Sequence, residues 1–273
     1  MAAVKVPLRQ PRAGQPVEAV ASLATPPLPP VAATAAARLS VIIPVYNERN
    51  TLRELLERVR TQGIAWQERP VELEIVVVDD CSNDGGVDFL ELDENRKAFP
   101  EVRLIRHPAN RGKGAAIRTG LRHATGNVVL IQDADLEYDP ADYPILLRPI
   151  LTGKAKVVYG SRFLGEHKAM YFWHSVGNQF LTLVTNVLFD TTLTDMETCY
   201  KVFTAEVASR LRLKSERWGF DPEITARILK MGYRIYEVPI SYAGREHWEG
   251  KKIQAWRDGP KVLVTLLRYR FFR

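Results

Sequence analysis

The feature that most constrains this chain is a short apolar run that ends in acidic residues, Val128-Val129-Leu130-Ile131-Gln132-Asp133-Ala134-Asp135. A run this short and rich in β-branched residues predicts a buried strand. Asp133 and Asp135 are two positions apart, so both would point to one side at the carboxyl end of the strand, where open α/β sheets bind ligands. Such carboxylates suit Mg²⁺ or Mn²⁺, which prefer oxygen ligands. In isolation Asp-x-Asp more often marks a polar turn, so this assignment depends on the rest of the chain.

Four further apolar runs predict strands, and helical segments separate them. The runs lie at residues 41–43, 73–78, 102–105 and 156–159. This alternation predicts an α/β domain with a doubly wound, mostly parallel sheet and a Rossmann-like nucleotide crevice along one edge. The 273 residues and 46% hydrophobic content are sufficient for one large domain of this kind.

Polar residues follow these runs at the same predicted edge of the sheet. Asp79 follows the second run and could accept hydrogen bonds from a base or ribose, although its surroundings are equally ordinary turn chemistry. Gly112-Lys113-Gly114 opens a helix, where backbone N–H groups favour phosphate, but it matches neither a P-loop nor a dinucleotide fingerprint. Arg162 follows the fifth run and could hold phosphate or form a surface salt bridge.

Charge and cysteine content narrow the classes of partner. The formal charge of +6 predicts an anionic partner, which charge alone does not identify. The domain lacks a basic and aromatic stripe, so we expect no nucleic-acid binding. Two cysteines with neither metal nor disulfide spacing indicate a reducing, cytosolic setting. No stretch approaches the ~20 apolar residues of a membrane span, which predicts a soluble or peripheral protein.

The two ends of the chain differ in composition from the part between them. Residues 1–38 are rich in alanine and proline and are expected to form a disordered tail ahead of a domain at 39–242. Residues 243–273 predict a basic amphipathic helix that either lies in a membrane interface or packs on the domain. A further amphipathic helix is predicted at 171–188, and core packing is favoured over lipid contact for its apolar face.

Five motifs resemble, in their order and spacing, those of family-2 glycosyltransferases of the GT-A fold. They are Ile42-Ile43-Pro44-Val45-Tyr46-Asn47-Glu48, Val77-Val78-Asp79-Asp80-Cys81-Ser82, Asn110-Arg111-Gly112-Lys113-Gly114, Asp133-Ala134-Asp135 and Gly160-Ser161-Arg162. The resemblance spans about residues 39–242. Within the family the chain looks most like the dolichyl- or polyprenyl-phosphate mannosyl- and glucosyltransferases. Glu137 stands where those enzymes commonly have glutamine, and Cys199 where they often have glycine.

The resemblance implies sites for a donor, a metal and an acceptor. The implied nucleotide-sugar site consists of Pro44, Tyr46, Glu48, Asp79, Lys113, Asp133, Ala134, Asp135 and Arg162. The implied ligands of Mg²⁺ or Mn²⁺ on the donor diphosphate are Asp133, Asp135 and Glu137. The basic residues expected to meet an acceptor phosphate are Arg245, Lys251 and Lys252. The candidate catalytic residues are Asp135, Arg162, Asp195 and Glu197.

Together these observations predict an inverting, metal-dependent hexosyltransferase. It would move mannose or glucose from a UDP- or GDP-sugar to polyprenyl or dolichyl phosphate, bound peripherally at the cytoplasmic face of a membrane. A phosphate acceptor is already anionic and needs no strong base. The nearest alternative is a glycan or soluble hydroxyl acceptor, which would need Asp195 or Glu197 as a base. An alternative of another class is a sugar nucleotidyltransferase, although the glycine-rich N-terminal loop typical of that class is not seen.

Overall fold

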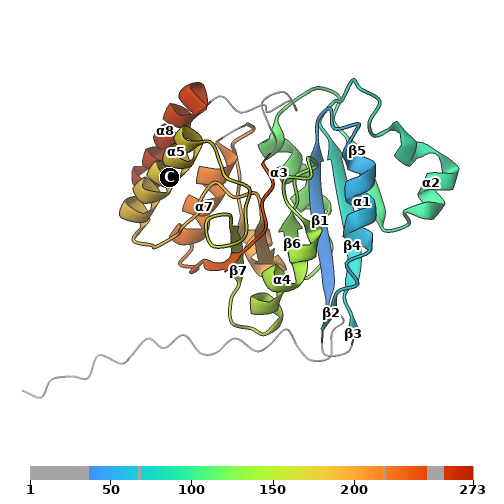
Figure 1. The fold of residues 1–273 in the computed structure, drawn as a ribbon, viewed down its shortest axis with the longest axis horizontal. Coiled ribbons are helices and arrows are strands. Elements are labelled where there is room, and N and C mark those ends of the chain that lie inside the picture. The colour runs from blue at the N-terminus through green and yellow to red at the C-terminus, as the bar shows by residue number, and fades with distance from the viewer. Residues whose placement is uncertain (1–36, 67–68, 218, 245–254, 273) are drawn as a thin grey trace, which may run out of the picture.

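A seven-stranded sheet forms the centre of the molecule (Figure 1). The computed structural model describes residues 37–66, 69–217, 219–244 and 255–272. The strands of the sheet are β1 (Arg38–Val45), β4 (Glu72–Asp79), β5 (Val102–Arg106), β6 (Val128–Ile131), β7 (Val157–Ser161), β8 (Lys201–Thr204) and β9 (Tyr236–Pro239). A separate antiparallel ribbon joins β2 (Ala65–Trp66) to β3 (Arg69–Pro70).

The strand order is β5-β4-β1-β6-β8-β7-β9. All neighbouring pairs are parallel except those of β8, which runs antiparallel to both β6 and β7. The carboxyl ends of β1, β4, β6 and β7 therefore lie at one edge of the sheet. The amino end of β8 lies there too, because Lys201 pairs with Ile131 and Tyr159. The predicted α/β fold with a mostly parallel sheet is confirmed, while β8 has no counterpart among the predicted strands.

Helices cover the sheet, and some of them pack on one another at one end of the molecule. They are α1 (Leu52–Arg60), α2 (Asp93–Ala98), α3 (Lys113–His123), α4 (Tyr143–Leu151), α5 (Phe172–Phe189), α6 (Ala205–Arg210), α7 (Phe220–Lys230) and α8 (Ala255–Phe271), with 3-10 turns η1 (Asp88–Glu91) and η2 (Pro140–Asp142). α3 packs on β1 and β4, and α4 packs on β7 and β8. α5, α7 and α8 pack on one another at the end of the molecule opposite α2 (Figure 1).

The approach of α3 to β1 depends on a residue without a side chain. A Cβ atom at Gly120 would collide with the side chain of Ile42. Because glycine has no Cβ, α3 can lie directly against β1. This contact brings the first residue of α3, Lys113, to the carboxyl edge of the sheet. The position of a charged side chain is therefore fixed by packing two helical turns away.

The predictions for the two ends of the chain have different outcomes. The predicted tail lies almost wholly outside the described residues, and the boundaries at 38 and 242 stay predictions. The helix expected at 171–188 is α5, and the basic C-terminal segment contains α8, which packs against α5 and α7. No helix in the described ranges is both long enough and apolar enough to cross a membrane.

Candidate active site

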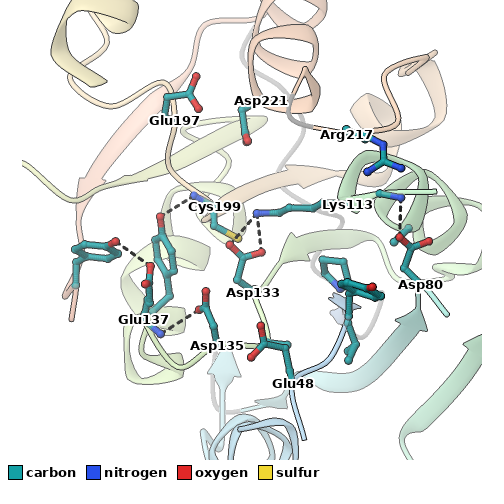
Figure 2. A pocket seen from close by; sticks show the side chains of 18 of the residues that line it. Glu48, Asp80, Lys113, Asp133, Asp135, Glu137, Glu197, Cys199, Arg217 and Asp221 are labelled. Atoms are coloured by element: carbon teal, nitrogen blue, oxygen red, sulfur yellow. Dashed lines mark hydrogen bonds and ion pairs between the residues drawn. The ribbon is translucent and has the colours of Figure 1, made fainter. Parts of the chain in front are cut away.

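A cavity of about 410 Å³ lies at the carboxyl ends of β1, β4, β6 and β7 (Figure 2). Each of these strands delivers polar residues to its wall, which include Glu48, Asp80, Asp133 and Arg162. A volume of this size is typical of pockets that bind small organic ligands. The cavity therefore occupies the ligand site that the strand topology predicts.

The two aspartates that follow β6 are held differently (Figure 2). The Nζ atom of Lys113 lies 2.7 Å from Oδ1 and 2.8 Å from Oδ2 of Asp133. Burial alone would raise the pKa of Asp133, but the charge and hydrogen bonds of Lys113 hold that pKa below its ordinary value. Burial would lower the pKa of Lys113, yet the charge of Asp133 raises it well above the usual value. Asp133 is therefore ionised, and Lys113 is positively charged at neutral pH.

The chain bends directly after Asp135. Leu136 has a φ of 62°, in the left-handed region that non-glycine residues seldom adopt. The bend allows the backbone N–H of Glu137 to donate to Oδ1 of Asp135 at 3.1 Å. The hydroxyl of Tyr242 donates to Oε2 of Glu137 at 2.8 Å. The carboxylates of Asp133, Asp135 and Glu137 all follow β6 and line the cavity. Those of Asp135 and Glu137 are each oriented by a hydrogen bond.

The carboxylate oxygens at the cavity wall fit a divalent cation that is bound together with a diphosphate. Within the described ranges no three His, Cys, Asp or Glu residues form a complete metal cluster. Mg²⁺ usually takes only one or two carboxylates and completes its shell with water and phosphate oxygens. Asp133 and Asp135 supply hard oxygen atoms of that kind at the cavity wall.

The loop before α3 is held by Asp80 rather than left open for phosphate. The carboxylate of Asp80 accepts the N–H of Arg111 at 2.9 Å and the N–H of Gly112 at 2.6 Å. Its Oδ1 also lies 2.7 Å from Nδ1 of His107. Gly112 has a φ of 96°, and a Cβ there would lie 2.5 Å from the carbonyl oxygen of Glu216. The N–H groups of Arg111 and Gly112 therefore already have a carboxylate partner, and phosphate binding at the Gly112-Lys113-Gly114 junction stays a prediction.

Arg162 is fixed at the cavity wall by Asp195. Nε and Nη2 of Arg162 donate to the two carboxylate oxygens of Asp195 at 2.7 and 2.8 Å. The Arg162 backbone N–H also donates to Oδ2 at 3.1 Å. Asp195 is fully buried and does not line the cavity, whereas Arg162 does. The geometry therefore makes Asp195 a residue that positions Arg162, and its predicted role as a base stays a prediction.

Glu197 lines the cavity, and its environment opposes ionisation. Its Oε1 atom is buried and has no hydrogen-bond partner among the described residues. Burial, followed by the negative charge of Asp221, raises the pKa of Glu197 to about 8. Asp221 itself accepts a hydrogen bond from Nζ of the buried Lys201 at 2.6 Å. Glu197 is therefore a carboxyl group that titrates near neutral pH inside the cavity, which is a common property of catalytic acids and bases.

The structure brings most of the predicted site residues together. Those that line the cavity are Pro44, Tyr46, Glu48, Lys113, Asp133, Ala134, Asp135, Glu137, Arg162 and Glu197. Asp79 is buried, does not line the cavity, and accepts the N–H of Ser82 at 2.9 Å. The predicted acceptor-phosphate residues Arg245, Lys251 and Lys252 lie outside the described residues. The roles of all these residues stay predictions.

Other residues of the cavity were not predicted as site residues. They include Asp80, Asn110, Tyr138, His174, Cys199, Arg217, Asp221 and Tyr242. Asp80 could have been inferred from strand alternation, because it would point to the opposite side from Asp79. Tyr242 and Arg217 come from segments far along the chain, and no local pattern connects them to β6. Figure 2 shows Arg217 and Lys113 on the same side of the cavity.

Residues 40–212 match the domain described as glycosyl transferase family 2. The chain belongs to this family. As a glycosyltransferase, it is similar to the dolichyl-phosphate beta-glucosyltransferase ALG5A of Trichomonas vaginalis. The two are 29% identical over 227 residues, which cover 79% of this chain and 69% of that relative.

Solved structures of other glycosyltransferases share the fold of this family member. Glucosyl-3-phosphoglycerate synthase from Mycobacterium tuberculosis, in complex with Mn²⁺, UDP and glucosyl-3-phosphoglycerate, aligns with a TM-score of 0.64 at 18% identity, over 87% of this chain and 81% of that one. The mannosyltransferase PcManGT from Pyrobaculum calidifontis, in complex with GDP-Man and Mn²⁺, aligns with a TM-score of 0.55 at 22% identity, over 86% and 70%. The predicted GT-A fold is confirmed.

Proposed function

We propose that this glycosyltransferase moves a hexose from a nucleotide diphosphate sugar to polyprenyl or dolichyl phosphate, with inversion and with Mg²⁺ or Mn²⁺. The observation that carries the proposal is the cavity in which Asp133, Asp135 and Lys113 share a wall with Arg162. It offers carboxylates for a cation and fixed positive charges for phosphate. The similarity to a dolichyl-phosphate beta-glucosyltransferase supports the lipid acceptor and a glucosyl donor.

Separate groups of cavity residues have separate roles in the proposed reaction. Pro44, Tyr46 and Glu48, at the end of β1, contact the nucleoside. Asp133 and Asp135 would hold the divalent cation, which would supply positive charge to neutralise the departing diphosphate. Lys113 and Arg162 add positive charge that is already oriented before the reaction, so little reorganisation is needed as the bond breaks. An acceptor phosphate is anionic at neutral pH and attacks without a base.

The donor and the place of reaction are part of the same proposal. The structural neighbours hold UDP in one case and GDP-Man in the other, each with Mn²⁺. We propose a UDP- or GDP-hexose donor for this chain on that ground. We also propose peripheral attachment at the cytoplasmic face of a membrane, where a polyprenyl-phosphate acceptor would be embedded. The two free cysteines, Cys81 and Cys199, are consistent with a reducing compartment.

A hydroxyl acceptor is the second candidate, and Glu197 is the observation that favours it. A sugar or other hydroxyl must lose a proton as it attacks, and the base should titrate near the working pH. Glu197 lines the cavity and has a pKa raised to about 8. A neighbour in fold is a synthase of glucosyl-3-phosphoglycerate, a small soluble product.

Transfer of radiolabel from UDP-glucose, GDP-mannose and related donors distinguishes these candidates. Each donor is incubated with polyprenyl phosphate and with Mg²⁺, Mn²⁺ or EDTA, and label is counted in the lipid phase. We expect label in the lipid that EDTA abolishes. If a donor binds but no lipid is labelled, the lipid acceptor is excluded, and soluble hydroxyl acceptors should be tested with Glu197→Gln as the matched variant.

A further inference from the structure

One face of α5 exposes a continuous row of apolar side chains. The row, named here the α5 stripe, consists of Trp173, Val176, Phe180, Leu183 and Val187. The spacing of three and four residues places all five on one side of the helix. Trp173 is 78% exposed, Leu183 is 58% exposed and Val187 is 75% exposed. Contiguous exposed apolar surface of this kind marks an interaction site in a soluble domain.

The α5 stripe is distinct from the face with which α5 packs on the domain. The packing face contains Leu181, Val184, Leu188 and Phe189, which contact the core cluster of Met196, Val262 and Leu266. The sequence of α5 from 172 to 189 contains no Asp, Glu, Lys or Arg. Core packing, the role favoured from the sequence, therefore accounts for only one side of an uncharged helix.

The neighbouring helix α8 also exposes apolar side chains and adds positive charge. α8 packs beside α5 at the end of the molecule (Figure 1). It exposes Val264, Leu267 and Phe271 together with Arg268 and Arg270. Residues 259–273 contain no Asp or Glu. An apolar surface with arginine on its borders is complementary to a bilayer interface that carries anionic headgroups.

The α5 stripe begins beside the active-site cavity. His174, in the first turn of α5, lines the cavity. Trp173 is its neighbour in the chain and is the first residue of the stripe. Phe172 is 69% exposed and packs edge to face on Trp173, with ring centroids 5.1 Å apart. Aromatic side chains of this type favour the boundary between headgroups and acyl chains.

We propose that the α5 stripe and the exposed face of α8 insert into the surface of an anionic bilayer and hold the cavity at the level of the lipid headgroups. The occupant is a bilayer rather than a second copy of the chain. A symmetric dimer would pair this surface with itself and bring Arg268 and Arg270 of both copies together, and neither α5 nor residues 259–271 of α8 contains an acidic residue to pair with them. The purpose of the docking rests on the proposed lipid acceptor, but the docking itself needs no substrate.

Vesicle binding with a matched pair of variants tests this inference. The purified full chain is sedimented with vesicles of phosphatidylcholine alone or mixed with phosphatidylglycerol. Leu183→Glu places a charge in the α5 stripe, and Leu92→Glu places the same charge on a leucine that is 52% exposed and lies before α2, at the opposite end. We expect stronger binding to the anionic vesicles, a fall of about tenfold or more for Leu183→Glu, and no change for Leu92→Glu.

The possible outcomes separate this inference from the proposed function. Donor binding by calorimetry should be the same for both variants, which verifies that each is folded. Absence of vesicle binding by the wild-type chain, or equal losses in the two variants, would overturn the inference. A dimer that Leu183→Glu dissociates, with no vesicle binding, would instead identify an interface between copies. Transfer to a short-chain polyprenyl phosphate in detergent tests the lipid acceptor independently of docking.

Discussion

Lys113 already supplies Asp133 with a positive charge, whereas Asp135 is oriented by the backbone N–H of Glu137. A divalent cation that contacts both aspartates would compete with Lys113 for Asp133. Asp135 also lines the cavity, and it can be substituted without removing the ion pair between Lys113 and Asp133. We therefore expect both aspartates to contribute to metal-dependent donor binding, and substitution of Asp135 to be the more direct test of the metal site.

Asp135→Asn tests this assignment. The amide keeps the shape of the side chain but loses its negative charge, so Mn²⁺-dependent affinity for the donor should fall about a hundredfold or more, while the fold is retained. Calorimetric titration of donor with Mn²⁺ and with EDTA measures the effect. Asp93→Asn, on the distant helix α2, is the control. Unchanged Mn²⁺-dependent affinity in Asp135→Asn would eliminate the metal site at this carboxylate.

Glu197 links the stability of the fold to pH. Its pKa is raised from 4.5 to about 8 in the folded chain, so the folded state retains a proton that the unfolded state releases. The contribution of this retained proton to the free energy of unfolding is complete below pH 4.5 and is lost as the pH rises towards 8. We expect the thermal midpoint of the wild-type chain to fall more steeply across this interval than that of Glu197→Gln. Parallel pH profiles of the two midpoints in scanning calorimetry would contradict the raised pKa.

At the scale of elements, the end of β4, the loop at 107–112 and the start of α3 are connected by one carboxylate. Asp80→Ala would leave the N–H groups of Arg111 and Gly112 and the ring of His107 without their partner. Unsatisfied buried groups of this kind cost about 1–3 kcal/mol each, so we expect a loss of at least about 2 kcal/mol in the free energy of unfolding. Urea denaturation measures this loss. Donor KM should also rise, because Lys113 is displaced.

The neighbouring residue provides the control for that change. Cys81 is exposed, and Cys81→Ala removes only a thiol from the same turn. We expect Cys81→Ala to leave the free energy of unfolding within about 0.5 kcal/mol of the wild-type value and donor KM unchanged. If Asp80→Ala behaves in the same way, Asp80 does not hold the loop in solution.

The sequence predicts the elements whose residues carry a local pattern. β1, β4 and β6 are apolar runs that end in polar residues, and the site residues directly after them, such as Tyr46 and Asp133, are predicted with them. β8 begins with Lys201, which is fully buried because Asp221, twenty positions later, supplies its counter-charge. Its burial therefore depends on a tertiary contact that no window of neighbouring residues contains.

The same reasoning applies to the site. Asp195 and Glu197 are two positions apart, and both were predicted as catalytic residues. Only the tertiary structure distinguishes their roles, because Arg162, which follows β7, binds Asp195 while Glu197 reaches the cavity. Likewise, the hydrogen bond from Tyr242 to Glu137 joins residues 105 positions apart. Sequence patterns predict which residue types gather at a strand end, but the pairing among them is set by the tertiary structure.

At the scale of the whole molecule, α8 is a structural part of the domain as well as a border of the apolar surface. Val262 and Leu266 are buried against α5, and the hydroxyl of Tyr269 donates to Oε1 of Glu223 at 2.7 Å. Glu223 also accepts the N–H groups of Lys214 and Ser215. The C-terminal helix thus stabilises the segment that leads to Arg217 at the cavity.

Two adjacent leucines of α8 separate these roles. Leu266 is fully buried, so Leu266→Ala should lower the free energy of unfolding by about 2–5 kcal/mol through loss of apolar contact and formation of a cavity. Leu267 is 39% exposed, and Leu267→Ala should change the free energy of unfolding by no more than about 0.5 kcal/mol. Urea denaturation compares the two. Equal effects would show that α8 does not pack on α5 in solution as described.

The place of β8 in the sheet has a consequence for synthesis of the protein. β6 ends at Ile131, but the strand that pairs with its free side begins only at Lys201. A ribosome therefore releases the first half of the sheet while one edge of β6, all of whose residues are buried in the finished fold, is still unpaired. Unpaired apolar edges of this kind promote aggregation of nascent chains. We therefore expect chains interrupted between Ile131 and Lys201 to aggregate more readily than the completed chain.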